Sequence, residues 1–285
     1  MREEIATQIA EVAKLLDKYG KYPNTTKELF DIADGVKAEA SDFEQLFPRY
    51  LTLYDILEKE FAEYTSVAGQ EFRRLCFNEI SLIILRALKS VGLEYFDVVD
   101  PVRKPISKRL EDMENYLFPV AVFAKKLLEE FSDTKENRVV LFHLEAYSYL
   151  VSLEGIFDDL ARLLFFFEEL PKGNVCKLSD LERMDVKMII RVLKYRPFFL
   201  INWEERCHWR NAIAHAHAYY DPDTDIIHFI SVKQLTQEVE YDKHISMWDF
   251  LKGYQELDDA RAAYILNMLL VSVFWLLMKA KHEKK

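Results

Sequence analysis

The stretch WRNAIAHAHAYYDPDTDIIHF, from Trp209 to Phe229, contains side chains that can transfer protons and bind phosphate. Its polar groups include one arginine, one asparagine, two tyrosines and three histidines, namely Arg210, Asn211, Tyr219, Tyr220, His215, His217 and His228. A histidine can accept and return a proton near neutral pH. A guanidinium suits phosphate oxygens and the extra negative charge of a pentacoordinate phosphoryl transition state. These groups fit metal-free cleavage of RNA, which needs a base for the 2′-hydroxyl, an acid for the 5′-oxygen and a cation between them.

Helical spacing limits how the arginine and the first histidine can cooperate. Arg210 and His215 are five residues apart, so their side chains leave an ideal helix roughly 140° apart. We expect them to meet only if the helix unwinds near His215 or the arginine reaches around it. Asn211 lies four residues before His215, on the same face of the expected helix, and can hold the imidazole or a phosphate by hydrogen bonding. Because one motif supplies one essential histidine, a symmetric dimer would be needed to supply both proton-transfer groups.

The rest of the chain predicts an all-α protein in which this stretch ends a helix. Hydrophobic residues make up 50% of the chain, and Leu, Glu, Lys, Ala and Arg recur at helical spacing. Pro23, Pro101 and Pro105 are expected to break the N-terminal helices. The expected helices span residues 2–19, 25–38, 41–66, 70–91, 107–131, 141–170, 179–195 and 199–217, and a last helix ends near residue 281.

A polar junction, FSDTKENR from Phe131 to Arg138, divides these helices into two regions. We expect an N-terminal helical domain of unknown role over residues 1–135 and a second helical domain over residues 136–285. In the second domain the turn DPDTD precedes IIHFISV, whose β-branched and aromatic residues predict a small β-hairpin insertion. Ser246 followed by Asp249 predicts a capping box at the start of the last helix.

Composition excludes several classes of protein. The net charge of −10 offers no broad attraction to nucleic acid or anionic lipid, so any phosphate binding must be local. Three widely spaced cysteines without a C-x-x-C pair argue against a disulfide framework and a cysteine-rich zinc site, and they fit a reducing cytoplasm. The N-terminal residues lack the apolar core of a secretory signal. Without a Gly-rich phosphate loop or H-E-x-x-H, we expect neither a cofactor nor a metal.

The apolar stretch from Ala262 to Met278 has two interpretations. A membrane-spanning helix needs about 20 such residues, and lengths near this one are more typical of buried helices. We therefore favour a central helix that is covered on all sides, by the fold or by a second subunit, and expect no membrane insertion.

RNAIAH, from Arg210 to His215, resembles the R-x(4–6)-H motif of the HEPN superfamily, whose members are small four-helix domains. Many of them are metal-independent RNases of toxin–antitoxin, abortive-infection and CRISPR-linked defence systems, with the motif at a dimer cleft. The resemblance implies a HEPN-like four-helix bundle in the C-terminal half and a homodimeric endoribonuclease in a defence, toxin–antitoxin or stress system. It implies that Arg210 and His215 are the catalytic pair, supported by Asn211, and that the RNA product ends in a 2′,3′-cyclic phosphate.

The sequence departs from one subgroup of this superfamily. Some HEPN toxins have R-x(4)-H-x-Y, in which a partner nucleotidyltransferase modifies the tyrosine. Here His217 occupies that position, and tyrosines follow only at Tyr219 and Tyr220. The departure argues against control by nucleotidylation. It leaves these three residues as further candidate site residues, and an antitoxin or regulatory protein as a possible partner.

Basic residues near the motif are candidates for binding RNA. Between Arg183 and Arg210 there are seven basic residues against three acidic ones, in a chain that is acidic overall. Three of the basic residues share one face of the expected helix, and a fourth precedes the motif: Lys187, Arg191, Lys194 and Arg206. We expect them to guide RNA phosphates toward the motif, with a solvated helix face as the alternative.

Non-catalytic interpretations remain for each motif. His215 can be a histidine stabilised at a helix C-terminus, with Arg210 paired to Glu204 or Glu205. His215, His217 and His228 can be metal ligands, although no carboxylate or cysteine completes the set. Glu154 and Asp158 can bind a divalent ion, or can lie on a solvated helix face. At the level of the whole domain, the alternative to an RNase is a HEPN-like binding module for a nucleotide, a nucleic acid or a partner protein.

Overall fold

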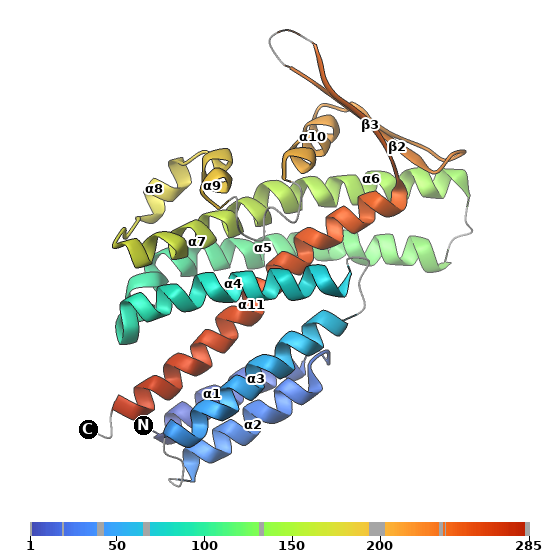
Figure 1. Ribbon diagram of the computed structural model, residues 1–285. Helices are drawn as coiled ribbons and strands as arrows, with labels where there is room; N and C mark the ends of the chain where they lie inside the picture. The colour runs from blue at the N-terminus through green and yellow to red at the C-terminus, as the bar shows by residue number, and fades with distance from the viewer. Residues whose placement is uncertain are drawn as a thin grey trace. The chain divides into compact units, whose positions relative to one another are not determined.

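The protein is mostly helical, with one small antiparallel sheet near its C-terminal region (Figure 1). The structure is a computed structural model that describes residues 2–18, 20–38, 43–64, 69–130, 134–193, 203–233, 236 and 238–282. Contacts between residues divide the chain into two compact units. Unit 1 contains residues 1–99, 166–175 and 262–285, and unit 2 contains residues 100–165 and 176–261.

This division differs from the expected boundary near residue 135. Two C-terminal segments, Phe166–Val175 and Ala262–Lys285, belong to the same unit as the N-terminal residues. Three helices contribute residues to both units, namely α5 (Tyr95–Glu130), α7 (Asp158–Glu169) and α11 (Met247–His282). A polar junction in the sequence marks a break between two helices. It does not show which helices share a core, because that depends on contacts between residues that are far apart in the sequence.

Unit 1 is built on α1 (Arg2–Asp17), α2 (Pro23–Lys37), α3 (Phe43–Glu63) and α4 (Gln70–Val91), each packed on the next. Every third or fourth residue of α1 is buried, as the amphipathic pattern requires. The apolar part of α11 in this unit is anchored by polar groups. The Asn267 amide donates hydrogen bonds to the carbonyl oxygens of Phe77 (3.1 Å) and Ala263 (2.9 Å), and the Trp275 indole donates to that of Leu93 (2.9 Å).

Helix α11 is long and apolar enough, by length and composition, to cross a membrane. In its most apolar window 56% of the residues are buried inside the protein. A core helix of a soluble protein meets the same criteria.

Unit 2 surrounds the candidate motif. Here α6 (Lys135–Val151) continues through a π-helical turn, η2 (Ser152–Phe157), into α7, and Figure 1 shows the three as one continuous run. Helix α10 (Trp203–Ala214) packs on α6 and on strand β2. The core between them is aromatic, and its buried rings belong to Phe142, Tyr149, Trp209, Phe229 and Phe250.

The sheet contains three strands in the order β1 (Ala218–Asp221), β2 (Ile226–Val232) and β3 (Val239–Ser246). The expected hairpin corresponds to β1 and β2, whereas β3 was not predicted. Only Ile245 of β3 is buried, and its remaining residues are mostly charged or polar, so the strand has weak β-propensity and a weak alternating pattern. Ser246 caps the start of α11 as expected, because the Asp249 amide donates to the Ser246 hydroxyl (3.1 Å), and that hydroxyl donates to Asp249 Oδ2 (2.8 Å).

Two helix predictions were wrong. Helix α5 begins at Tyr95 and continues through Pro101, Pro105 and Pro119, because buried residues recur along the same face and outweigh the lost backbone hydrogen bonds. The helix expected over residues 179–195 is two short helices, α8 (Leu178–Arg183) and α9 (Val186–Val192). The break lies at Met184, whose backbone is extended (ψ 135°).

Candidate functional site

The C-terminal end of α10 places the motif at the surface of unit 2. Ala216 has a left-handed backbone (φ 57°), the Ala216 amide donates to Ile213 O (3.1 Å), and the His217 amide donates to Ala212 O (2.7 Å). This pair of bonds is the Schellman motif that ends many helices. His215 therefore lies in the turn after the helix, with an exposed side chain. Helix α10 ends at Ala214, three residues before the expected end at His217, so His215 follows the helix rather than lying within it.

Arg210 is held from two sides by oxygen acceptors. Its Nη1 donates to Asn211 Oδ1 (2.9 Å), and its Nη2 pairs with Glu154 Oε1 (2.5 Å). The Arg210 and Glu154 side chains are 40% and 47% exposed, so the guanidinium remains open to a ligand from solvent. Of the two alternative partners of Arg210, the Glu204 side chain lies outside the described residues, and Glu205 binds Tyr241 and Lys243.

The π-helical turn η2 presents Glu154 to Arg210. A π-turn accommodates an extra residue in a helix, and such turns are common at functional sites. Ser152, Leu153, Ile156 and Phe157 are buried, whereas Glu154 is exposed. Gly155 allows α5 to approach the π-helical turn closely, because a Cβ at this position would overlap the side chain of Met113 in α5. The divalent-ion interpretation of Glu154 and Asp158 gains no support, because Glu154 pairs with a guanidinium.

Asp158 adds a second carboxyl group near Arg210. Burial raises the pKa of Asp158 to about 6, and the charges of Arg162 and Arg210 oppose this rise. The neighbouring Asp159 and Glu154 charges raise the pKa of Asp158 further. Asp159 itself is bound by Arg109 of α5 through two hydrogen bonds (2.8 and 3.1 Å), which ties α5 to α7. A carboxyl group that titrates near pH 6 is suited to exchange protons under mild conditions.

The other predicted site residues lie in different environments. Arg191 is exposed on α9, and Lys187 belongs to the same helix. Lys194 lies outside the described residues. Arg206 does not fit the predicted contact with RNA, because it is 7% exposed and its Nη2 pairs with Glu256 Oε2 (2.9 Å) beneath Trp209.

The candidates that follow His215 also differ from one another. His217 and Tyr219 are exposed. Tyr220 is buried, and its hydroxyl donates to Asp225 Oδ1 (2.7 Å). Tyr220 is therefore a structural residue. His228 contacts the rings of Tyr219 and His244. In the residues that the structure describes, no group of three or more His, Cys, Asp or Glu side chains is arranged to hold a metal ion.

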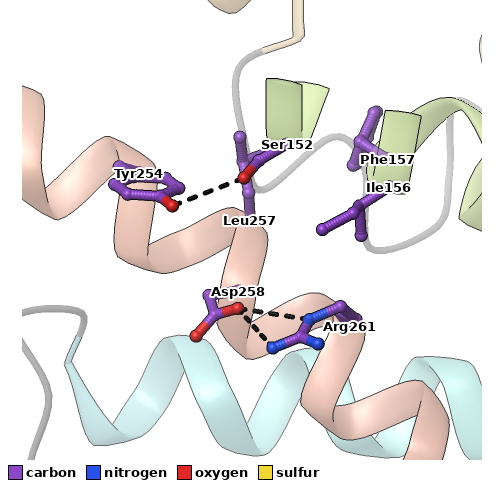
Figure 2. A pocket seen from close by; sticks show the side chains of 7 residues that line it. All are labelled: Ser152, Ile156, Phe157, Tyr254, Leu257, Asp258 and Arg261. Carbon is purple, nitrogen blue, oxygen red and sulfur yellow. Dashed lines mark hydrogen bonds and ion pairs between the residues drawn. The ribbon is translucent and has the colours of Figure 1, made fainter. Parts of the chain in front are cut away.

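A small pocket lies beside the π-helical turn and is lined by buried residues of that turn rather than by Glu154. Figure 2 shows its lining, which comprises Ser152, Ile156, Phe157, Tyr254, Leu257, Asp258 and Arg261. Asp258 and Arg261 form an ion pair at its edge (2.7 Å). Its volume of about 10 Å³ has room for roughly one water molecule, so the pocket does not fit a nucleotide.

Sequence reasoning missed the link between Glu154 and Arg210. The chain separates these residues by more than fifty positions, and neither lies in a recognisable motif with the other. The carboxylate pair Glu154 and Asp158 was visible as a pattern, but its cationic partner was not. Comparison of the chain with protein-family models, curated proteins and solved structures finds no significant match.

Proposed function

We propose that the protein is a metal-independent endoribonuclease with a HEPN-like site formed by Arg210, Asn211 and His215. The observation that carries the proposal is the placement of an exposed imidazole in the turn after α10, with a partly exposed guanidinium in the last turns of the same helix. The Arg210 guanidinium stabilises the pentacoordinate phosphate. Asn211 holds that guanidinium in place through its 2.9 Å hydrogen bond.

The reaction is an internal transesterification. An imidazole accepts the proton of the ribose 2′-hydroxyl, the 2′-oxygen attacks phosphorus, and the bond from phosphorus to the 5′-oxygen breaks. A second proton donor protonates the leaving 5′-oxygen. The products are a 2′,3′-cyclic phosphate and a 5′-hydroxyl, and no water or metal ion enters this step.

We propose that a second copy of the chain supplies the second proton-transfer group. Exposed aromatic and apolar side chains lie on α5 and α6 of unit 2: Tyr116, Phe118, Val122, Phe123, Val140 and Tyr147. The hydroxyls of Tyr116 and Tyr147 are 2.6 Å apart, which joins the two helices at this surface. Exposed groups of this kind are typical of protein interfaces. A symmetric dimer formed here is the assembly that we expect.

The alternative is a binding module that uses the same residues without catalysis. The ion pair between Glu154 and Arg210 favours it, because an RNA phosphate must compete with a carboxylate that already occupies the guanidinium. The carboxylate also offsets the positive charge that would stabilise a pentacoordinate phosphate, an effect that reduces catalysis more than it reduces binding of a ground-state phosphate.

RNase assays in EDTA distinguish the two functions. We expect wild-type protein to cleave RNA with cyclic-phosphate ends, and we expect His215→Ala and Arg210→Ala to reduce the rate at least about 100-fold. Lys177→Ala is the matched control, because Lys177 is an exposed basic residue of the same unit and lies outside the proposed dimer surface. Cleavage by both site variants at the wild-type rate would exclude the nuclease, and binding of RNA without any cleavage would favour the alternative.

A further inference from the structure

The outer face of the sheet carries a row of three rings in register, which we call the ring row: Tyr219, His228 and His244. Tyr219 pairs with His228 across β1 and β2, and His228 pairs with His244 across β2 and β3. The Tyr219 and His228 rings are parallel, with centroids 4.3 Å apart. The His244 ring lies 4.2 Å from His228 and is tilted by 56°. The neighbouring residues of β2, Ile227 and Phe229, point to the buried face.

The ring row continues toward the candidate catalytic histidine. The Ile230 amide donates to the His217 carbonyl (3.1 Å), so the pairing of β1 with β2 extends to His217. Residues two apart on a strand share a face, which places His217 on the same face as Tyr219. The ring centroids of His217 and His215 are 6.5 Å apart. Rings therefore extend along one surface from β3 to the turn that follows α10.

The ring row is accessible and does not serve the core. Tyr219 is 53% exposed, so one face of its ring covers His228 while the other is open to solvent. The two carboxylates beside the row are already engaged. Asp221 accepts hydrogen bonds from the Asp223 amide (3.0 Å) and the Thr224 hydroxyl (2.7 Å), and Asp242 lies 3.5 Å from His244 Nε2.

Exposed aromatic rings on a sheet suit the bases of single-stranded RNA. Unpaired bases stack on aromatic and histidine side chains, and each such contact contributes independently of base sequence. A base that stacks on the open face of Tyr219 extends a stack that is already ordered, so little side-chain entropy is lost on binding. The adjoining phosphodiester then lies along the surface that leads to His215.

We propose that the ring row is a stacking site for the bases of single-stranded RNA, and that it positions the substrate for cleavage at His215. The assignment of RNA as the ligand rests on the proposed function. Binding is measured separately from cleavage, so the two proposals can fail separately.

The test uses two labelled oligomers of about ten nucleotides, a length within the range that single-strand binding sites cover. One is 2′-O-methyl oligoadenylate, whose blocked 2′-oxygen prevents transesterification, so wild-type protein can be used. The other has the same backbone without bases. We expect fluorescence anisotropy to show at least about tenfold tighter binding of the oligomer with bases. Tyr219→Ala is expected to remove most of that difference, whereas Tyr219→Phe retains it because the ring remains.

Phe30→Ala is the matched control, because Phe30 is an exposed ring on α2 of unit 1, outside both the sheet and the proposed dimer surface. Equal binding of the two oligomers, or equal effects of Tyr219→Ala and Phe30→Ala, would overturn the proposal. If binding depends on bases and on Tyr219 but wild-type protein cleaves no RNA, the stacking site stands and the nuclease does not. Circular dichroism of each variant checks that the sheet and helices are retained.

Discussion

The guanidinium of Arg210 lies 2.5 Å from the carboxylate of Glu154, which joins the end of α10 to the π-helical turn between α6 and α7. Both groups are partly exposed, so the pair is screened by solvent and an anionic ligand can replace the carboxylate. The state of Arg210 therefore depends on a residue that belongs to another helix.

Glu154→Gln is expected to strengthen binding of RNA. The variant removes the competing negative charge while keeping a hydrogen-bond acceptor for Arg210. Exposed ion pairs contribute up to about 1 kcal/mol, so we expect the dissociation constant of 2′-O-methyl RNA to fall by about two- to fivefold. Glu136→Gln, on α6, is the control for a change in net charge. Unchanged or weaker binding by Glu154→Gln would show that the carboxylate positions Arg210 rather than competing for it.

Asp158→Asn is expected to change how stability depends on pH. The pKa of Asp158 is about 6 in the folded protein, against about 3.9 in an unfolded chain. The folded state therefore binds the Asp158 proton more tightly than the unfolded state does. The stability that the protonated Asp158 carboxyl group contributes is complete below about pH 4 and is lost as pH rises through 6. The variant should lose this slope and should be more stable than wild type at pH 7.5 by about 1 to 2 kcal/mol.

Urea denaturation between pH 4.5 and 7.5 measures this effect. Asp180→Asn, on the exposed surface of α8, should leave the slope unchanged. A wild-type slope in Asp158→Asn would mean that another group titrates in this range.

Ala216→Gly is expected to stabilise the protein by about 1 kcal/mol. Ala216 has a φ of 57°, a conformation in which a Cβ is strained and which glycine adopts freely. Ala218→Gly is the control, because β1 gains nothing from glycine and should be destabilised. Chemical denaturation provides the comparison. Loss of RNase activity in Ala216→Gly, with stability increased, would indicate that the strained turn holds His215 in its active position.

Gly253→Ala is expected to destabilise unit 2. A Cβ at this position would overlap the Arg206 guanidinium, which is buried between Trp209 and Glu256. Helix propensity alone would favour alanine by about 1 kcal/mol, but displacing the buried ion pair should outweigh this and give a net loss of about 1 to 2 kcal/mol. Gly69→Ala is the control, because nothing lies within 4 Å of a Cβ there. A gain in stability for Gly253→Ala would show that Arg206 moves aside at little cost.

Phe123→Asp is expected to weaken the proposed dimer more than tenfold, because a charge would replace an exposed aromatic ring of the proposed dimer surface. Light scattering across a dilution series measures the change, and RNase activity should fall with the dimer fraction. Leu82→Asp is the control, because Leu82 is an exposed apolar residue of unit 1. A monomeric wild-type protein that cleaves RNA would exclude shared catalysis.

Local sequence was sufficient to predict several elements of the fold. Helices α1 to α4, the helix that carries Arg210, the β1–β2 hairpin and the N-cap at Ser246 all follow from preferences that act over a few residues. The residue types around Arg210 and His215 also indicated the chemistry, because proton transfer and phosphate binding require those side chains wherever they lie.

Only the tertiary structure determined which residues surround them. The pairing of Glu154 with Arg210, the burial of Arg206 and Tyr220, the path of α5 through its prolines, and the third strand that completes the ring row all depend on contacts between distant segments. The physical reason is that burial and ion pairing are set by packing. A local pattern specifies how a segment folds, while the neighbours that bury its side chains or neutralise its charges come from elsewhere in the chain.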